Sequence, residues 1–164
     1  MTMRFPFVVY LDTNCINARG GEKAVADLQS FLRSRGANFQ KTSALDTELR
    51  GYRPGLAKSA DMVESLETGV WGFSRWDHAV YGSQKDDEDI SAILECLFGK
   101  RDRLAYSTQQ VMDAMHLHTA GRNGGHFFVT RDEEILSKAT AIQTLCAGLL
   151  PVTPEQCLEG LETK

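Results

Sequence analysis

Two short runs of apolar, β-favouring residues constrain the fold of this 164-residue chain more than any other feature. They are FVVYL at residues 7–11 and HFFVT at residues 126–130. A continuous apolar run of this length is typical of a strand in a parallel sheet that is covered on both faces. An acid follows each run, Asp12 directly after the first and Asp132 two residues after the second. In open parallel sheets, ligands bind where the strands end, so these acids are candidates for a functional site.

Segments with helical periodicity separate the strand-like runs. Residues 22–35 carry Val25, Leu28, Phe31 and Leu32 at helical spacing, and Gly36 follows as a C-cap. The same reasoning predicts helices over 43–49, 58–67, 86–98, 108–120 with an end at Gly121, 133–139 and 155–161, and strands over 37–42 and 149–154. The prolines of 149–154 favour an edge strand. This alternation predicts an α/β fold with a mainly parallel sheet and helices on both faces.

Length and composition indicate one globular domain over residues 1–164, with 42% hydrophobic and 24% charged residues. The net charge of −4 excludes the basic character of a tight, indiscriminate nucleic-acid binder, but it does not exclude a nucleic-acid enzyme with an acidic metal site. The four cysteines form no CxxC pair, and we expect free thiols packed as small hydrophobes. No secretory signal or membrane span is evident, so we expect a cytoplasmic protein without a membrane partner.

Residues 69–85 (GVWGFSRWDHAVYGSQK) are rich in aromatic residues and glycine, and we expect a loop or irregular insertion there. Three interpretations remain open for this stretch. Its aromatic side chains could stack single-stranded bases, or form an interface with a protein partner. They could also form a satellite hydrophobic cluster under a long loop, which is the commonest outcome and the one we favour.

Four acids follow or adjoin the predicted strands. Besides Asp12 and Asp132, Glu48 lies about one turn into the helix after the 37–42 strand, and Asp113 lies within the helix 108–120. The neighbours of Asp113 are apolar (VM before it and AM after it), so its carboxylate is either unfavourably placed or held by another group. Converging carboxylates raise one another's pKa, and a divalent cation such as Mg²⁺ removes the conflict. Together the four acids therefore indicate metal-assisted hydrolysis of a phosphodiester.

Each acid also has a structural interpretation. Asp12 could cap the turn that follows it, with Thr13 and Asn14, and Asp132 could cap a helix starting at Glu133. Glu48 alone would be a solvated helix residue. The acid-rich KDDED at residues 85–89 is explained by the favourable dipole of a first helical turn rather than by a second metal site.

Several motifs resemble the PIN-domain ribonucleases, including the VapC-type toxins. They are LDTN, TSALDTEL, MDAMHLHTAGRNGGHFFVTRD and VTPEQCLEGL, and they span the chain in order from Val8 to Leu161. The most specific part is the spacing from Asp113 through a glycine turn and a strand to Thr130 and Asp132. The resemblance implies a Rossmann-like α/β/α fold with three layers and a central parallel sheet. It also implies RNA cleavage that depends on Mg²⁺ or Mn²⁺.

Carried over to this sequence, the resemblance implies an acidic cluster of Asp12, Glu48, Asp113 and Asp132. We expect Asp12, Asp113 and Asp132 to hold the metal, and Glu48 to bind it or orient the attacking water. The supporting polar positions of the family correspond to Asn14, Ser43 and Thr130. RNA is the implied substrate, and a cognate antitoxin protein and a second copy of the chain are the protein partners to test. The chain departs from the family in its long interval between Glu48 and Asp113 and in His118, where a small residue is usual.

Basic residues near the acids are candidates for RNA binding. Arg50 and Arg53 follow Glu48 directly, and they form either a phosphate-binding rim or a solvated basic loop. Arg19 and Arg131 lie nearer the acids in the sequence, where they could bind phosphate or compensate the acidic charge.

Two rival functions come from other classes. The first is a non-catalytic module of PIN type that binds RNA or protein, against which the presence of all four acids argues. The second is a small-molecule phosphohydrolase. A phosphatase with a nucleophilic Asp would carry a second acid two residues after Asp12, but Asn14 stands there, and no GxGxxG or P-loop pattern occurs.

Overall fold

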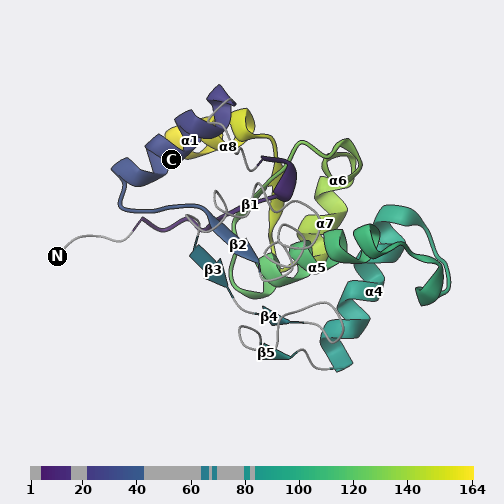
Figure 1. The fold of residues 1–164 in the computed structure, drawn as a ribbon. Coiled ribbons are helices and arrows are strands. Elements are labelled where there is room, and N and C mark those ends of the chain that lie inside the picture. Colours follow the sequence, from purple (N-terminus) through teal and green to yellow (C-terminus); the bar gives the residue numbers. More distant parts are fainter. Residues whose placement is uncertain (1–4, 16–21, 43–63, 67, 70–79, 82–83) are drawn as a thin grey trace.

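The computed structural model describes residues 5–15, 22–42, 64–66, 68–69, 80–81 and 84–164 (Figure 1). Five strands form one sheet in the order β3-β2-β1-β6-β7, and every neighbouring pair is parallel. The strands are β1 Val9–Leu11, β2 Gln40–Thr42, β3 Glu64–Leu66, β6 Phe127–Val129 and β7 Leu150–Val152. The predicted α/β class with a parallel sheet is therefore confirmed.

The order in which the chain adds strands to the sheet reverses between β1 and β6. From β1 the chain adds β2 and then β3 on one side, and it later returns to add β6 and β7 on the other side of β1. Tyr10 at the centre of β1 pairs with Gln40 of β2 and with Phe128 of β6. This is the switch point at which parallel α/β sheets open a crevice at their carboxyl edge.

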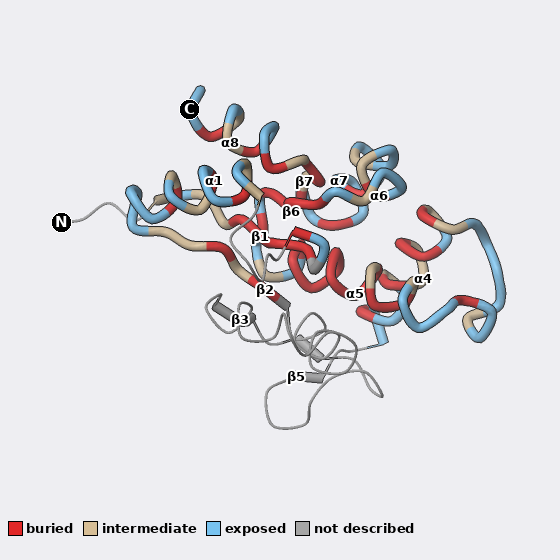
Figure 2. The backbone as a smooth tube through the Cα atoms, turned by 45° about the horizontal axis from the view of Figure 1, so that its top comes forward, coloured by how far each residue is buried: buried red, intermediate tan, exposed pale blue. Residues whose placement is uncertain are grey.

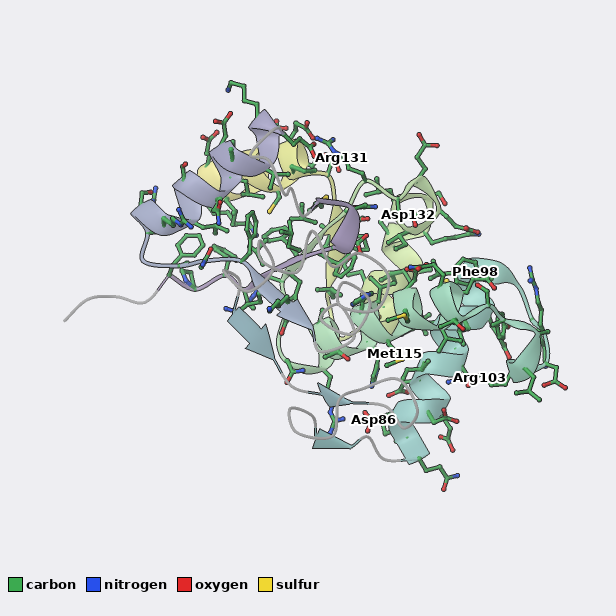
Figure 3. The ribbon with its side chains drawn as sticks, in the orientation of Figure 1. Asp86, Phe98, Arg103, Met115, Arg131 and Asp132 are labelled. Atoms are coloured by element: carbon green, nitrogen blue, oxygen red, sulfur yellow. The ribbon has the colours of Figure 1, made fainter. Side chains whose placement is uncertain are left out.

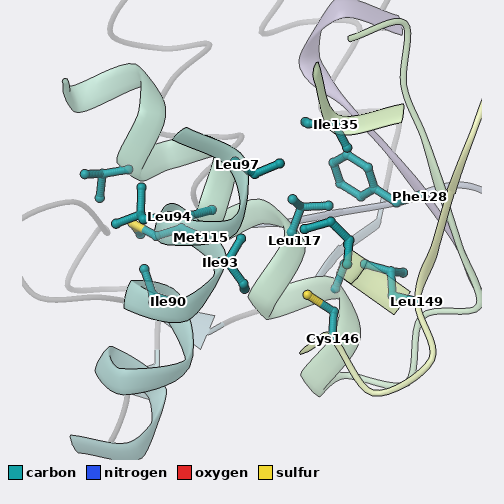
Figure 4. Packing of buried hydrophobic residues seen from close by; sticks show 14 of the residues in the cluster. Ile90, Ile93, Leu94, Leu97, Met115, Leu117, Phe128, Ile135, Cys146 and Leu149 are labelled. Atoms are coloured by element: carbon teal, nitrogen blue, oxygen red, sulfur yellow. The ribbon is translucent and has the colours of Figure 1, made fainter. Parts of the chain in front are cut away.

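Helices cover both faces of the sheet. On one face, α1 (Lys23–Ser34) and α8 (Pro154–Glu162) pack over a core that includes Val9 and Leu11 of β1 and Val129 of β6. On the other face lie α4 (Gln84–Phe98), α5 (Thr108–Arg122), α6 (Glu133–Ser137) and α7 (Ala139–Leu145). Their core contains Tyr10 and Phe128, and Figure 4 shows α4 and α5 meeting through apolar side chains such as Ile93 and Met115.

Helix α5 is the most deeply buried helix near the switch point. A capping box starts it, because Ser107 accepts a hydrogen bond from the Gln110 backbone N–H and the Gln110 side chain accepts one from the Ser107 N–H. Most of its residues from Val111 to Gly121 are buried, and Figure 2 shows the burial along most of its length. An acid on this helix is therefore held close to the sheet.

Most of the predicted elements are present. The strands predicted at 7–11, 37–42 and 126–130 correspond to β1, β2 and β6, and the edge strand at 149–154 corresponds to β7. Gly36 adopts φ +71° after α1, as a C-cap glycine does, and the Ala37 N–H donates to the carbonyl of Leu32. The helices predicted at 86–98 and 155–161 correspond to α4 and α8.

Two predictions between β2 and α4 are wrong in part. Residues 64–66 form strand β3 rather than the end of a helix over 58–67. They pair in parallel with β2 and so provide hydrogen-bond partners for the backbone groups along its edge. Within the segment 69–85, residues Val80–Tyr81 form strand β5, which pairs in parallel with β4 (Thr68–Gly69) as a separate sheet. The helix predicted at 43–49 lies outside the described residues.

Two helix ends also differ from the prediction. Helix α5 continues past Gly121, and Gly124, at φ +78°, follows its end. Gly121 serves packing instead, because a Cβ at this position would overlap with the backbone carbonyl of Cys146 after α7. The helix predicted over 133–139 ends at Ser137 as α6, and the unpredicted helix α7 continues the layer.

All four cysteines are free, and Cys15, Cys146 and Cys157 are buried, as expected for thiols packed as small hydrophobes. In the described parts of the chain, no helix combines the length and the apolar character needed to span a bilayer.

Candidate functional site

Asp12 follows β1 at the switch point and is almost completely buried, with 7% of its surface exposed. Its backbone N–H donates to the carbonyl of Val129, which continues the pairing of β1 with β6. Its Oδ2 accepts a hydrogen bond of 2.7 Å from the Thr130 hydroxyl. The predicted turn is also present, as the 3₁₀ helix η1 (Thr13–Cys15). The side chain of Asp12 is therefore held from β6 in addition to preceding a turn.

Thr130 joins the first and last acids. Its side chain is fully buried at the end of β6, and its Oγ1 donates to Asp12 and accepts from the backbone N–H of Asp132 at 3.0 Å. One hydroxyl therefore uses both its donor and an acceptor site to set the spacing between the two strand ends. Thr130 is therefore a structural link between the segments that carry Asp12 and Asp132.

Asp132 caps helix α6. Its Oδ1 accepts hydrogen bonds from the backbone N–H groups of Glu134 and Ile135, at 2.9 and 3.4 Å. The capping interpretation is therefore correct for one carboxylate oxygen. No hydrogen bond from a described residue reaches the other oxygen, Oδ2. That oxygen remains available to a ligand while the first holds the helix.

Asn14 connects the turn after β1 to the loop after β6. Its side-chain Oδ1 accepts from the backbone N–H of Arg131 at 3.2 Å and from the Cys15 thiol at 3.3 Å. Both connections at this edge, from Asn14 and from Thr130, run between residues more than a hundred positions apart in the sequence. Asn14 therefore acts as a structural support between the two segments that carry Asp12 and Asp132.

Asp113 brings α5 into the same group. Its pKa is raised to about 7, mainly by burial; the charges of Asp12 and Asp132 also raise it, while a hydrogen bond from Gln109 and the neighbouring His116 lower it. Because the charges of Asp12 and Asp132 act on Asp113, the three acids lie near the same carboxyl edge of the sheet. Figure 3 shows Asp132 next to α6.

The donor set suits a hard divalent cation. It consists of carboxylate oxygens alone, and within the described residues Oδ2 of Asp113, like that of Asp132, accepts no hydrogen bond. Among these residues, however, no three His, Cys, Asp or Glu side chains are grouped closely enough to hold a metal ion. An ion that keeps several waters and uses few direct carboxylates fits such an open arrangement.

The remaining predicted residues divide into two sets. Glu48 and the candidate residues Ser43, Arg19, Arg50 and Arg53 lie outside the described residues, as do most of the aromatic residues of the 69–85 stretch. Arg131 is described, and its guanidinium forms ion pairs with Glu22 and Glu155. The positive charge of Arg131, which the sequence suggested for binding RNA phosphate, is therefore paired with two carboxylates of the fold.

The two histidines of α5 are both buried. His116 is 1% exposed and lies close enough to Asp113 to lower its pKa. His118 does not point outward, because its Nε2 lies 2.9 Å from Asp86 Oδ1 near the start of α4. Asp86 also pairs with Arg122 at 2.9 Å, so this acid of the KDDED run stabilises the packing of α4 on α5.

Sequence reasoning missed the partners of two groups. Nothing in the local sequence connects Arg131 to Glu22, which is 109 positions away, or His118 to Asp86, which is 32 positions away. The only local signal was the position of Arg131 between Thr130 and Asp132.

Comparison with known proteins assigns the chain to no family. No family model matches it, and no curated protein or solved structure compared with it is similar enough to count as a match.

Proposed function

We propose that this protein is an endoribonuclease that depends on Mg²⁺ or Mn²⁺ and has a PIN-like, Rossmann-like α/β/α fold. One observation carries the proposal: Asp12, Asp113 and Asp132 come from three separate segments of the chain, and the charges of Asp12 and Asp132 act on Asp113 near the switch point. The position agrees with where parallel α/β sheets bind ligands. The order of the acids along the chain agrees with the resemblance described above.

The residues divide the work in this proposal. Asp12 is held by Thr130 and is almost completely buried. Asp132 contributes the oxygen that does not cap α6. Asp113, with a pKa of about 7, holds a proton in part of the population at neutral pH and releases it when positive charge enters. When bound, a divalent cation at such a site stabilises negative charge on the phosphate and lowers the pKa of a water. Glu48 is proposed as the fourth acid.

The deciding experiment compares cleavage of single-stranded RNA by the unmodified protein and by Asp113→Asn, with Mg²⁺ and with EDTA. We expect cleavage to require the metal and to fall by roughly a hundredfold or more in the variant, as for the loss of a group that stabilises transition-state charge. Asp27→Asn is the matched control, because Asp27 is an exposed acid of α1 paired with Lys23. Equal cleavage by the Asp113 variant, or cleavage that persists in EDTA, would count against the proposal.

Titration with Mn²⁺ separates this enzyme from a non-catalytic module of the same fold. If the protein is the proposed enzyme, Mn²⁺ should bind, and the binding should be weaker in Asp113→Asn. A module that only binds RNA or protein does not need to bind Mn²⁺. Absence of Mn²⁺ binding to the unmodified protein would favour the module.

A toxin role is the narrowest form of the proposal and rests on the resemblance. Its test is expression in a bacterial host without any antitoxin. Growth arrest by the unmodified protein, and normal growth with Asp113→Asn, is the expected result. Normal growth with both, at equal protein levels, would leave RNA processing or decay as the role.

A further inference from the structure

The side chain of Arg131 joins three segments of the chain. Its Nη1 and Nη2 donate to Oε2 and Oε1 of Glu155, each at 2.7 Å, in the paired geometry that suits a guanidinium and a carboxylate. Its Nε donates to Glu22 Oε1 at 2.7 Å, and Nη2 donates to the same oxygen. These three residues, Arg131, Glu22 and Glu155, are called the arginine clamp below.

The two carboxylates belong to the helices that cover one face of the sheet. Glu22 is the N-cap residue of α1, and Glu155 lies in the first turn of α8. These helices share the core cluster around Val25, Leu28 and Leu161. Figure 3 shows Arg131 next to the ends of both helices. The clamp therefore ties the loop between β6 and α6 to a rigid pair of helices.

The same loop carries one candidate metal donor, Asp132, and its backbone contacts the supporting residues Asn14 and Thr130. The N–H of Arg131 donates to Asn14, Asp132 follows directly in the chain, and the N–H of Asp132 donates to Thr130. The Cys15 thiol lies at the same place, because it donates to the Asn14 oxygen that also accepts from the Arg131 N–H. The pKa of this thiol is raised to about 12, mainly by burial; the charges of Asp12 and Glu22 also raise it, and that of Arg131 lowers it.

We propose that Glu22 and Glu155 are positioning residues of the metal site, which act through Arg131 to hold the loop that presents Asp132 and supports Asn14. This inference rests on the proposed function, since it concerns the same acids. It assigns Arg131 a role different from RNA binding, because a guanidinium held by two carboxylates already has its charge neutralised and three of its nitrogens engaged. A rigid outer set of partners is what a weak, open carboxylate site needs to bind a cation selectively.

The test measures Mn²⁺ affinity by calorimetry for the unmodified protein, Glu22→Gln, Glu155→Gln and the double variant. We expect each single substitution to weaken binding about threefold to tenfold, at the low end of the effects of outer-shell partners, and the double variant to weaken it further. Glu159→Gln is the matched control, since it makes the same change of charge one turn further along α8, and we expect unchanged affinity. Thermal unfolding in EDTA verifies that each protein is folded at the titration temperature.

A metal-free measurement decides the same point independently. Amide hydrogen exchange in EDTA should become faster at Arg131 and Asp132 in Glu155→Gln and stay unchanged in Glu159→Gln. Unchanged Mn²⁺ affinity and unchanged exchange in both clamp variants would overturn the inference. If the unmodified protein binds no Mn²⁺, the proposed function fails, and the exchange rates still show whether the clamp holds the loop. If the double variant does not fold, the single variants and Arg131→Lys, which keeps the charge and loses the paired geometry, decide the outcome.

Discussion

Two acids on the face of the sheet covered by α4 to α7, buried Asp86 and half-buried Asp113, have opposite surroundings. Asp86 lies 2.9 Å from His118 Nε2 and 2.9 Å from Arg122 Nη1, so nearby cationic or polar groups balance its charge. Asp113 has a hydrogen bond from the neutral Gln109 and lies near His116, but burial and the charges of Asp12 and Asp132 outweigh these two and leave its pKa raised. The first environment is a closed ion pair that stabilises the packing of two helices. The second holds excess negative charge, which is what a site for a cation requires.

The comparison also explains why acid-rich sequence alone is a poor guide to function. The KDDED run contains more acids than any segment near the switch point, yet its members pair with residues of the fold: Asp86 with His118 and Arg122, Asp87 with Arg103, and Asp89 with Lys85. The candidate site instead draws single acids from separate elements. Charge that the fold does not balance is the distinguishing property.

Replacing Asp86 tests the ion pair between α4 and α5, and we expect it to change the free energy of unfolding more than any other proposed substitution. Asp86→Ala should lower the free energy of unfolding by about 3 kcal/mol, because it leaves buried His118 and also exposed Arg122 without their carboxylate. Urea denaturation followed by circular dichroism measures the change. Asp87→Ala is the control, since Asp87 pairs with Arg103 at the surface and should contribute less than about 1 kcal/mol. Equal losses in the two variants would contradict the distinction.

Addition of Mn²⁺ tests the excess charge at the other acid. A ligand that binds only the folded state stabilises it by about 2.7 kcal/mol at a hundred times its Kd. The thermal midpoint of the unmodified protein should therefore rise with Mn²⁺, and the rise should be lost in Asp113→Asn but retained in Asp86→Ala. A rise of equal size in Asp113→Asn would show that the ion binds elsewhere.

Without metal, Asp113 should cost stability at neutral pH. Its pKa is about 7 in the folded protein against 3.8 for an unperturbed carboxyl, so the folded state binds more protons than the unfolded state between these values. The free energy of unfolding then falls as pH rises from about 4 to 7, and the loss is complete above pH 7. Asp113→Asn should be more stable than the unmodified protein by roughly 1–3 kcal/mol at pH 8 in EDTA, and the difference should vanish near pH 4.

Denaturation curves at pH 4, 6 and 8 measure that difference. Asp27→Asn, on the surface of α1, should show no such pH dependence of its stability relative to the unmodified protein. An Asp113→Asn variant that is less stable than the unmodified protein at pH 8 would mean that the carboxylate is already balanced, as Asp86 is.

The smallest expected effect concerns Thr130, which supports the acids without carrying charge. Thr130→Val keeps the shape of the side chain and removes the hydroxyl that donates to Asp12. We expect a loss of about 1–2 kcal/mol in unfolding free energy, because the buried carboxylate loses a hydrogen bond. Mn²⁺ affinity should fall as well, because the spacing of Asp12 and Asp132 relaxes. Thr144→Val, at an exposed hydroxyl of α7, is the control and should leave the affinity unchanged.

Local sequence was sufficient for most of the fold because each signal acts over a few residues. Apolar runs predicted β1 and β6, periodic apolar residues predicted α1, α4 and α8, and the glycine after α1 predicted its end. The carboxyl-edge rule then predicted that Asp12 and Asp132 follow strand ends on one edge of the sheet, and the pairing of β1 with β6 makes these strand ends neighbours.

Tertiary contacts decided what local signals could not. Residues 64–66 belong to a segment, 58–67, predicted as a helix, but they pair with β2, since an unsatisfied strand edge outweighs a weak local preference. Gly121 was predicted to end a helix, but a glycine is required there because α5 approaches the backbone of Cys146, after α7, too closely for a Cβ atom. The sequence by itself determined the alternation of strands and helices and which acids follow the strands. Only the tertiary structure decided which charges are balanced, because the partners of Asp86 and Arg131 lie 24 to 109 positions away and meet only when the helices pack.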